Sequence, residues 1–129
     1  MRLLLDTQVW LWMIAERERF SAETAALLEN PANDLLLSAA SSWEIAIKYS
    51  PHKLTLPAPP AKYVPEQIAR TGVTPLPVEH SHALRVAELP PHHRDPFDRL
   101  LVAQAELEGA TLLTADRQFA PYGIPIQRV

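Results

Sequence analysis

The segment from Asp95 to Asp116, DPFDRLLVAQAELEGATLLTAD, constrains the fold more than any other part of the sequence. Its start predicts a helix, because Asp95 suits the capping position and proline is favoured at the first helical position. The apolar residues that follow lie on more than one side of this helix, which predicts that it is largely buried. Gly109 is suited to ending the helix, and the β-branched and leucine run 111–114 predicts a buried strand. The segment therefore predicts a buried helix and a strand, with acids at the helix start and the strand end.

The rest of the chain repeats this alternation of short apolar runs and helix-like segments. Strands are predicted at residues 2–5, 35–38, 73–78, 111–114 and 124–129. Helices are predicted at residues 7–16, 21–30, 41–49, 61–70 and 79–89, with a proline-rich loop at 51–60 and a short helical turn after residue 116. Alternating strands and helices favour parallel pairing through right-handed crossovers, with helices on both faces of the sheet. The predicted fold class is α/β: a single three-layer domain, residues 1–129, with a central, mostly parallel sheet flanked by helices.

Composition narrows the possible environments and partners. The chain has no cysteine, which excludes disulfides and zinc–thiolate sites and fits a reducing cytoplasm. The longest apolar run near the start, 9–15, is far shorter than the roughly 20 residues that span a bilayer, so no membrane association is expected. Asp6 interrupts the apolar residues after Arg2, which argues against a signal peptide. The net charge of −3 provides no global field for nucleic acid, so a polyanionic partner needs a local basic rim or a bound cation.

Four carboxylates fall where the predicted sheet would bring them together. Asp6 and Asp116 come at or just after the ends of two apolar strands. Glu44 lies one turn into the helix after the second strand, and Asp98 lies one turn into the helix that opens at Asp95. Ligands of open parallel sheets bind beyond the carboxyl ends of the strands. We therefore expect these four side chains at one edge of the sheet.

Each of these acids also has a structural explanation when it is taken alone. Asp6, Asp95 and Asp116 can cap helices, and Glu44 has the spacing of a capping-box partner for Ser41. Capping does not explain why the acids gather at one edge, where they repel one another unless a cation neutralises them. Oxygen ligands without cysteine favour Mg²⁺ or Mn²⁺, which polarise phosphoryl oxygens and activate water. The gathered acids therefore predict phosphodiester hydrolysis.

Several stretches of the sequence resemble the PIN-domain ribonucleases, and most of all the VapC-type toxins of bacterial toxin–antitoxin pairs. They are LLLDTQVWLW, LSAASSWEIAIK with the following KLTLP, LPVEHSHAL, LPPHHRDPFDRLLVAQA and LLTADRQFAPYGI. The resemblance covers nearly the whole chain in the same order, and it implies a PIN-like fold and an endoribonuclease that depends on Mg²⁺ or Mn²⁺. It also implies an RNA substrate, a cognate VapB-type antitoxin as partner, and a homodimer.

The same motifs imply the residues of the active site. Asp6 matches the acid that ends the first strand, and Glu44 matches the acid of the WEIA helix. Asp98 matches the acid before LLVAQA, and Asp116 matches the acid of LLTAD. By this resemblance the four are catalytic and bind the metal, with Asp6 and Asp98 holding the principal ion. Asp95, the first acid of DPFDR, is expected to be an auxiliary or outer-shell ligand.

Other side chains receive supporting roles. Thr7 and Thr114 are expected to orient carboxylates or waters by hydrogen bonding. Arg94, Arg99 and Lys48 are candidates for contacts with the RNA backbone, and a merely solvated surface is the alternative for each. None of the five histidines has the helical spacing of a metal-ligand pair. The histidine pair at 92–93 is interpreted either as a phosphate contact or as part of a solvated loop.

The first helix carries apolar residues on opposing sides, including Trp10, Trp12 and Met13. One side is expected to face the core, and the other is either buried as well or an exposed patch for a partner. By resemblance, that partner would be the C-terminal segment of the antitoxin in a groove beside this helix.

The sequence does not favour a phosphatase or a nucleotide-binding protein, but one alternative to the ribonuclease stays open. A phosphatase would use an acid after the first strand as nucleophile, but Asp6 is followed by Thr7 and Gln8 rather than by a second acid. A nucleotide-binding protein is not favoured, because the three glycines form no phosphate-cradling loop. A binding module that keeps the acidic pocket without turnover remains the alternative to the ribonuclease.

Overall fold

The computed structural model describes residues 1–50 and 52–129. Pro51, the first residue of the predicted proline-rich loop, lies outside the described residues. The strands are β1 (Arg2–Leu5), β2 (Asp34–Ser38), β3 (Thr74–Leu76), β4 (Thr111–Thr114) and β5 (Ile126–Arg128). The α-helices are α1 (Thr7–Ala15), α2 (Ala22–Glu29), α3 (Ala39–Tyr49), α4 (Pro60–Thr71), α5 (His80–Arg85) and α6 (Pro96–Glu108). Short 3-10 helices are η1 (Arg17–Arg19), η2 (Val86–Glu88) and η3 (Arg117–Tyr122).

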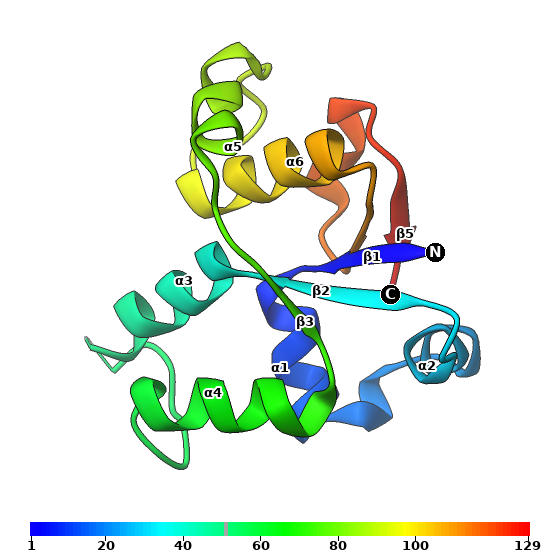
Figure 1. Cartoon of the computed structure of the whole chain (residues 1–129), viewed down its shortest axis with the longest axis vertical. Helices are drawn as coiled ribbons and strands as arrows, with labels where there is room; N and C mark the ends of the chain where they lie inside the picture. The colour runs from blue at the N-terminus through cyan, green and yellow to red at the C-terminus, as the bar shows by residue number, and fades with distance from the viewer. Residues whose placement is uncertain (51) are drawn as a thin grey trace.

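The strands form one sheet in the order β3-β2-β1-β4-β5, with β1 at its centre. Every pair of neighbouring strands is parallel. Helices α5 and α6 lie on one side of the sheet, and α1, α2 and α4 lie on the other (Figure 1). The predicted fold class, a parallel sheet flanked by helices, is confirmed. Because the strands are parallel, the residues that follow β1 and β4 come out at the same edge.

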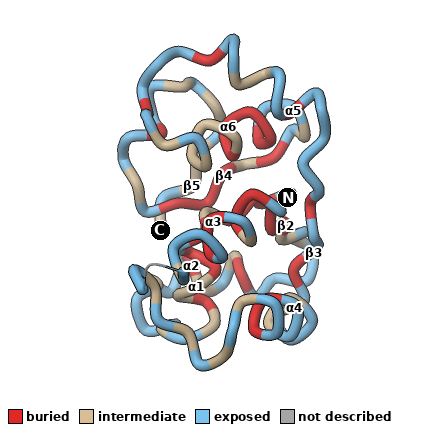
Figure 2. Tube along the Cα trace, turned by 90° about the vertical axis from the view of Figure 1, so that its left-hand side faces the viewer, coloured by how far each residue is buried: buried red, intermediate tan, exposed pale blue. Residues whose placement is uncertain are grey.

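The sheet is buried on both faces because apolar residues occupy successive positions of its central strands. Leu4 and Leu112 belong to the core on the α6 side, whereas Leu5 and Leu113 belong to the core on the α1 side. All four leucines are fully buried. Side chains alternate between the faces of a strand, so continuous leucine runs are what a sheet covered on both sides requires. Figure 2 shows the buried residues concentrated in the middle of the molecule, along the strands and the inner turns of the helices.

Helix α3 begins earlier than predicted, and this changes the reading of Glu44. Its cap is Ser38, whose hydroxyl accepts a hydrogen bond from the backbone N–H of Ala40 at 2.9 Å. The predicted capping box of Ser41 and Glu44 is therefore wrong, since both residues lie inside the helix. Capping consequently gives no account of why a buried glutamate stands at this position.

Three other predicted elements are shorter or divided in the structure. The predicted helix 79–89 consists of α5 followed by η2. Strand β3 spans only Thr74–Leu76, and β5 spans only Ile126–Arg128. Prolines at 77 and 125 flank these strands and cannot donate to a ladder, which limits the length of regular pairing. Within residues 1–50 and 52–129, none of the helices has the length and apolar character needed to cross a bilayer.

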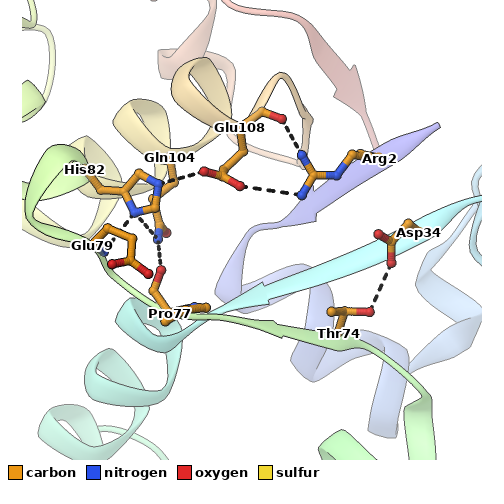
Figure 3. Close-up of polar contacts among 8 residues, drawn as sticks. All are labelled: Arg2, Asp34, Thr74, Pro77, Glu79, His82, Gln104 and Glu108. Atoms are coloured by element: carbon orange, nitrogen blue, oxygen red, sulfur yellow. Dashed lines mark hydrogen bonds and ion pairs between the residues drawn. The ribbon is translucent and has the colours of Figure 1, made fainter.

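A buried histidine joins α5, α6 and β1 at the C-terminal end of α6 (Figure 3). The backbone N–H of Glu79 donates to Nδ1 of His82 at 3.0 Å, so the ring proton is on Nε2, which lies 3.0 Å from a carboxylate oxygen of Glu108. The hydrogen bond from His82 lowers the pKa of Glu108, and Arg2 pairs with the same carboxylate. His82 therefore has a structural role, at the end of α6 opposite to Asp98.

Candidate active site

Two of the predicted acids follow directly from the central strands. Asp6 comes immediately after β1 and occupies the N-cap position of α1, but its side chain makes no capping hydrogen bond. Asp116 follows β4 by two residues, and its Oδ1 caps η3 by accepting from the backbone N–H of Gln118 at 2.9 Å. The capping explanation thus holds for one oxygen of Asp116 and fails for Asp6.

The pKa values of Asp98 and Asp6 respond to the charges of the other predicted acids. The pKa of Asp98 is raised from 3.8 to about 7, first by burial and then by the negative charges of Asp95, Asp6, Glu44 and Asp116. The pKa of Asp6 is also raised, mainly by burial, and Glu44 and Asp116 contribute to the rise. The fold therefore brings these carboxylates from β1, α3, α6 and the end of β4 to a single site, as the sequence predicts.

Thr114 connects the ends of the two central strands. Its hydroxyl donates to Oδ2 of Asp6 at 2.7 Å and accepts from the backbone N–H of Asp116 at 3.0 Å. This hydrogen bond lowers the pKa of Asp6, although burial outweighs it. Thr7 contacts Asp6 through its backbone, while its hydroxyl donates to Ser41 at 2.8 Å. Both threonines thus stand beside the acid that follows β1.

Glu44 is buried, and its carboxylate pairs with the ammonium group of Lys48. Nζ of Lys48, one turn later in α3, lies 2.6 Å from Oε2 of Glu44. The hydrogen bond to Glu44 raises the pKa of Lys48, and the charges of Asp95 and Asp98 add to the rise. A pocket of about 210 Å³ lies here, lined among others by Asp6, Glu44 and Lys48.

The remaining predicted residues are arranged around the first turn of α6. Asp95 caps this helix, because its Oδ1 accepts from the backbone N–H groups of Phe97 and Asp98 at 2.8 and 3.4 Å. The guanidinium of Arg99 donates to the carbonyl oxygens of Pro90, Val86 and Leu89, which holds the preceding loop. Arg94 is exposed beside this turn. A contact of Arg99 with RNA stays a prediction, and the structure gives that side chain a structural role.

The histidine pair divides into one exposed and one buried residue. His92 is exposed, whereas His93 is buried and stacks on Tyr122 with ring centroids 5.4 Å apart. Nε2 of His93 lies 3.7 Å from Oδ2 of Asp116. One ligand atom each from His93, Asp98 and Asp116 lie within 4.8 Å of one another. The interpretation of His93 as a solvated loop residue is therefore wrong, because its side chain is buried. In the sequence, only its position close before DPFDR indicated that it lies near the acidic site.

The donor set fits a hard divalent cation. Several carboxylates converge on one partly buried site, and the raised pKa values of Asp6 and Asp98 arise first from burial and then from the charges of neighbouring acids. Lys48 is placed to compensate one of these charges, through Glu44. Mg²⁺ and Mn²⁺ prefer oxygen ligands of this kind and remove the repulsion that raises such pKa values.

Helix α1 is buried on one side and half-buried on the other. Trp10 and Met13 belong to the core, while Trp12 is half-buried against Phe20 and under the guanidinium of Arg19, which lies 4.9 Å from its ring. The second side of α1 is therefore neither fully buried nor a fully exposed patch for a partner, because Phe20 and Arg19 cover part of it.

The sequence pattern of the PIN domain family matches residues 3–124. The chain belongs to the PIN domain family. This PIN domain is 31% identical over 127 residues to ribonuclease VapC22 of Mycobacterium tuberculosis, a match that covers 95% of this chain and 93% of that protein. It is 52% identical over 60 residues to ribonuclease VapC16 of the same organism, where the match covers 46% of this chain and only 43% of that relative. The resemblance to VapC-type toxins is thereby confirmed.

Several solved structures have the same fold, among them a toxin–antitoxin complex from Klebsiella pneumoniae that matches with a TM-score of 0.64 at 19% identity, covering 98% of this chain and 99% of the other. VapBC2 from Rickettsia felis, bound to a DNA fragment from its promoter, matches with a TM-score of 0.72 at 17% identity, covering 99% of this chain and 98% of the other. VapBC-1 from nontypeable Haemophilus influenzae matches with a TM-score of 0.70 at 16% identity, with coverages of 99% and 98%. At these identities the likeness concerns the fold of this PIN domain.

Proposed function

We propose that this PIN domain is a divalent-metal-dependent endoribonuclease that acts in the cytoplasm as the toxin of a toxin–antitoxin pair. The observation that carries the proposal is the meeting of Asp6, Glu44, Asp98 and Asp116 at the carboxyl edge of the sheet, where the charges of the other three add to the effect of burial in raising the pKa of Asp98. The two mycobacterial relatives are named ribonucleases, which supports RNA as the substrate.

In this proposal Asp6 and Asp98 hold the principal Mg²⁺ or Mn²⁺, and Glu44 and Asp116 complete the site directly or through water. The ion, when bound, supplies Lewis-acid polarisation of a phosphoryl oxygen and a water brought toward hydroxide. Asp98 must be ionised to take part, and its pKa of about 7 makes its proton available near neutral pH. Asp95 is an auxiliary residue that fixes the first turn of α6 through its cap.

Two side chains keep the ligands in place in this proposal. The hydroxyl of Thr114 donates a hydrogen bond to Oδ2 of Asp6, and this bond orients the other oxygen of the carboxylate. Thr7 ties α1 to α3 through Ser41 and so keeps the helix that carries Glu44 beside Asp6. Such outer hydrogen bonds set the orientation of metal ligands in proteins.

The net charge of −3 does not attract RNA to the chain as a whole, so in this proposal the RNA binds a local rim of basic side chains. Lys48 and Lys53 line the pocket that contains Asp6, and both also line a neighbouring pocket of about 400 Å³ together with Arg94 and Phe97. Lysine and arginine side chains bind the phosphate backbone of nucleic acids, which supports Lys48 and Arg94 as RNA contacts.

The proposed protein partner is a VapB-type antitoxin, and the proposed assembly of the toxin is a homodimer. One solved structure with this fold is a toxin–antitoxin complex, and two others are VapBC structures, which supports the antitoxin as partner. A groove of about 450 Å³ runs beside α1 and is lined mainly by apolar side chains, among them Leu11, Leu56 and Tyr63. This groove lies beside the helix where the family resemblance implies an antitoxin segment.

The test is cleavage of a defined single-stranded RNA by the purified chain, first in EDTA and then with Mg²⁺ or Mn²⁺ restored. We expect no cleavage in EDTA, recovery on addition of either ion, and a loss of at least about 100-fold in Asp6→Asn and Asp98→Asn, because outer-shell partners alone are worth 10–100-fold. Glu66→Gln is the matched control, since Glu66 is exposed on α4 and the change removes one charge. Cleavage that survives EDTA or both active-site variants would overturn the proposal.

A further inference from the structure

His93 is a buried polar side chain that the proposed mechanism leaves without a role. Its side chain is 3% exposed, and its Nε2 has no hydrogen-bond partner in the part of the chain that the structure describes. This atom points toward Oδ2 of Asp116 at 3.7 Å and shares a small volume with the ligand atoms of Asp98 and Asp116. A buried polar nitrogen normally has a partner, so its direction toward the acids is informative.

Tyr122 provides the hydrogen-bond partner of Nδ1 in the His93 ring. The backbone N–H of His93 donates to the hydroxyl of Tyr122 at 3.0 Å, and Nδ1 of the same residue lies 3.1 Å from that hydroxyl. A hydroxyl has one proton and two acceptor positions. Since it already accepts from the backbone, its own proton is free to go to Nδ1. When the hydroxyl donates to Nδ1, the ring proton is on Nε2, the nitrogen that faces the acids.

Aromatic rings hold the imidazole in this orientation. Phe119 and Tyr122, both in η3, pack on it with ring centroids 4.7 and 5.4 Å away. Asp116 is itself fixed at two points, because Thr114 accepts from its backbone N–H and Gln118 donates to Oδ1. The oxygen that these contacts leave over, Oδ2, is the one near His93.

We propose that His93 is a positioning residue of the acidic site, whose Nε2–H donates to Oδ2 of Asp116 and keeps this carboxylate turned toward Asp98. The inference rests on the proposed function for its consequence, which is the affinity for the divalent ion. The distance of 3.7 Å is longer than a formed hydrogen bond, and Asp116 is the acceptor that faces Nε2. The opposite tautomer would instead make His93 a direct ligand, and imidazole prefers softer ions than Mg²⁺.

The first measurement is the tautomer of His93 in the intact, metal-free chain, from long-range ¹H–¹⁵N NMR correlations of the ring. We expect the proton on Nε2, and in Tyr122→Phe we expect the two tautomers to mix because the donor to Nδ1 is removed. A proton on Nδ1 in the unaltered chain would overturn the proposal in favour of direct ligation. This readout needs neither a bound ion nor a variant of His93.

The second measurement is the Kd for Mn²⁺, followed by the EPR signal of the free ion. His93→Leu keeps an apolar side chain against Phe119 but removes the donor, so we expect binding to weaken about 10–100-fold. His93→Gln places an amide N–H near the position of Nε2 and is expected to restore most of the affinity. His80→Gln is the control at an exposed histidine of α5, with no expected change.

The outcomes separate this inference from the proposed function. Unchanged Mn²⁺ affinity in a folded His93→Leu chain, together with a loss in Asp98→Asn, would overturn the role of His93 and leave the nuclease proposal standing. Equal weakening in His93→Leu and His93→Gln would also overturn it, because the donor would then not matter. Unchanged affinity in Asp98→Asn would count against the proposed function itself.

Discussion

Replacing Asp98 with asparagine is expected to stabilise the metal-free protein while it removes the proposed activity. The carboxyl of Asp98 has its pKa raised from 3.8 to about 7, so its charged form is disfavoured in the folded state. At full strength a rise of this size corresponds to about 4 kcal/mol. Asp98 is only half-buried, and solvent screens part of the penalty, so we expect a gain of about 1–2 kcal/mol.

The gain in stability of Asp98→Asn is expected to be largest at high pH and to disappear at low pH. Above pH 7 the folded wild-type protein carries the disfavoured charge, and the asparagine variant has its full advantage. Between pH 7 and 3.8 the folded wild-type protein takes up a proton that the unfolded chain lacks, so the advantage shrinks as the pH falls. Below 3.8 both states of the wild-type protein are protonated and the advantage from this group is gone.

The assay is urea and thermal unfolding, followed by circular dichroism in EDTA at pH 8 and at pH 5. At pH 8 we expect the melting temperature of Asp98→Asn to be higher by about 4–8 °C, at roughly 4 °C per kcal/mol for a domain of this size. Glu66→Gln serves as the control for removing one exposed charge. An Asp98→Asn variant that is no more stable than the wild-type protein at pH 8, or whose gain is the same at pH 5, would refute the reasoning.

Three further predictions concern the same site and its supports. Mn²⁺ affinity should fall about tenfold for each pH unit below 7, because Asp98 must lose its proton to bind the ion. Calorimetric titrations with Mn²⁺ at pH 5.5–8 would measure this decrease in affinity. Thr114→Val should weaken Mn²⁺ binding about 10–100-fold by releasing Asp6, and an unaltered Kd in the EPR titration would speak against that role. His82→Leu should destabilise the fold by about 1–3 kcal/mol in urea, since Glu108 loses its buried donor, yet leave the Mn²⁺ affinity unchanged.

The arrangement of strands and helices could be predicted because it depends on local patterns. Leucine runs such as those of β1 and β4 are short and uninterrupted, which indicates strands covered on both faces. The start of α3 was predicted wrongly because Ser38 and Ser41 are equally good caps in sequence. Ser38 prevails because β2 ends there, and this depends on pairing with a strand far along the chain.

The acids of the site could be predicted for a related reason. Asp6 and Asp116 follow strands, so parallel topology alone places them at one edge. The role of His93 could not be predicted, since its orientation depends on Tyr122, which lies 29 residues further along. The same holds for Arg99, whose partners are carbonyl oxygens of a loop that only the folded chain brings within reach.

The hydrogen bond from Thr114 to Asp6 spans 108 positions of the chain. On a ribosome, the nascent polypeptide therefore contains Asp6 long before the threonine that orients it has been synthesised. A stalled or prematurely released fragment has β1 without β4 and so lacks half of the site. If the chain is a nuclease, a cell that makes it is exposed to cleavage only by copies whose synthesis has passed this threonine.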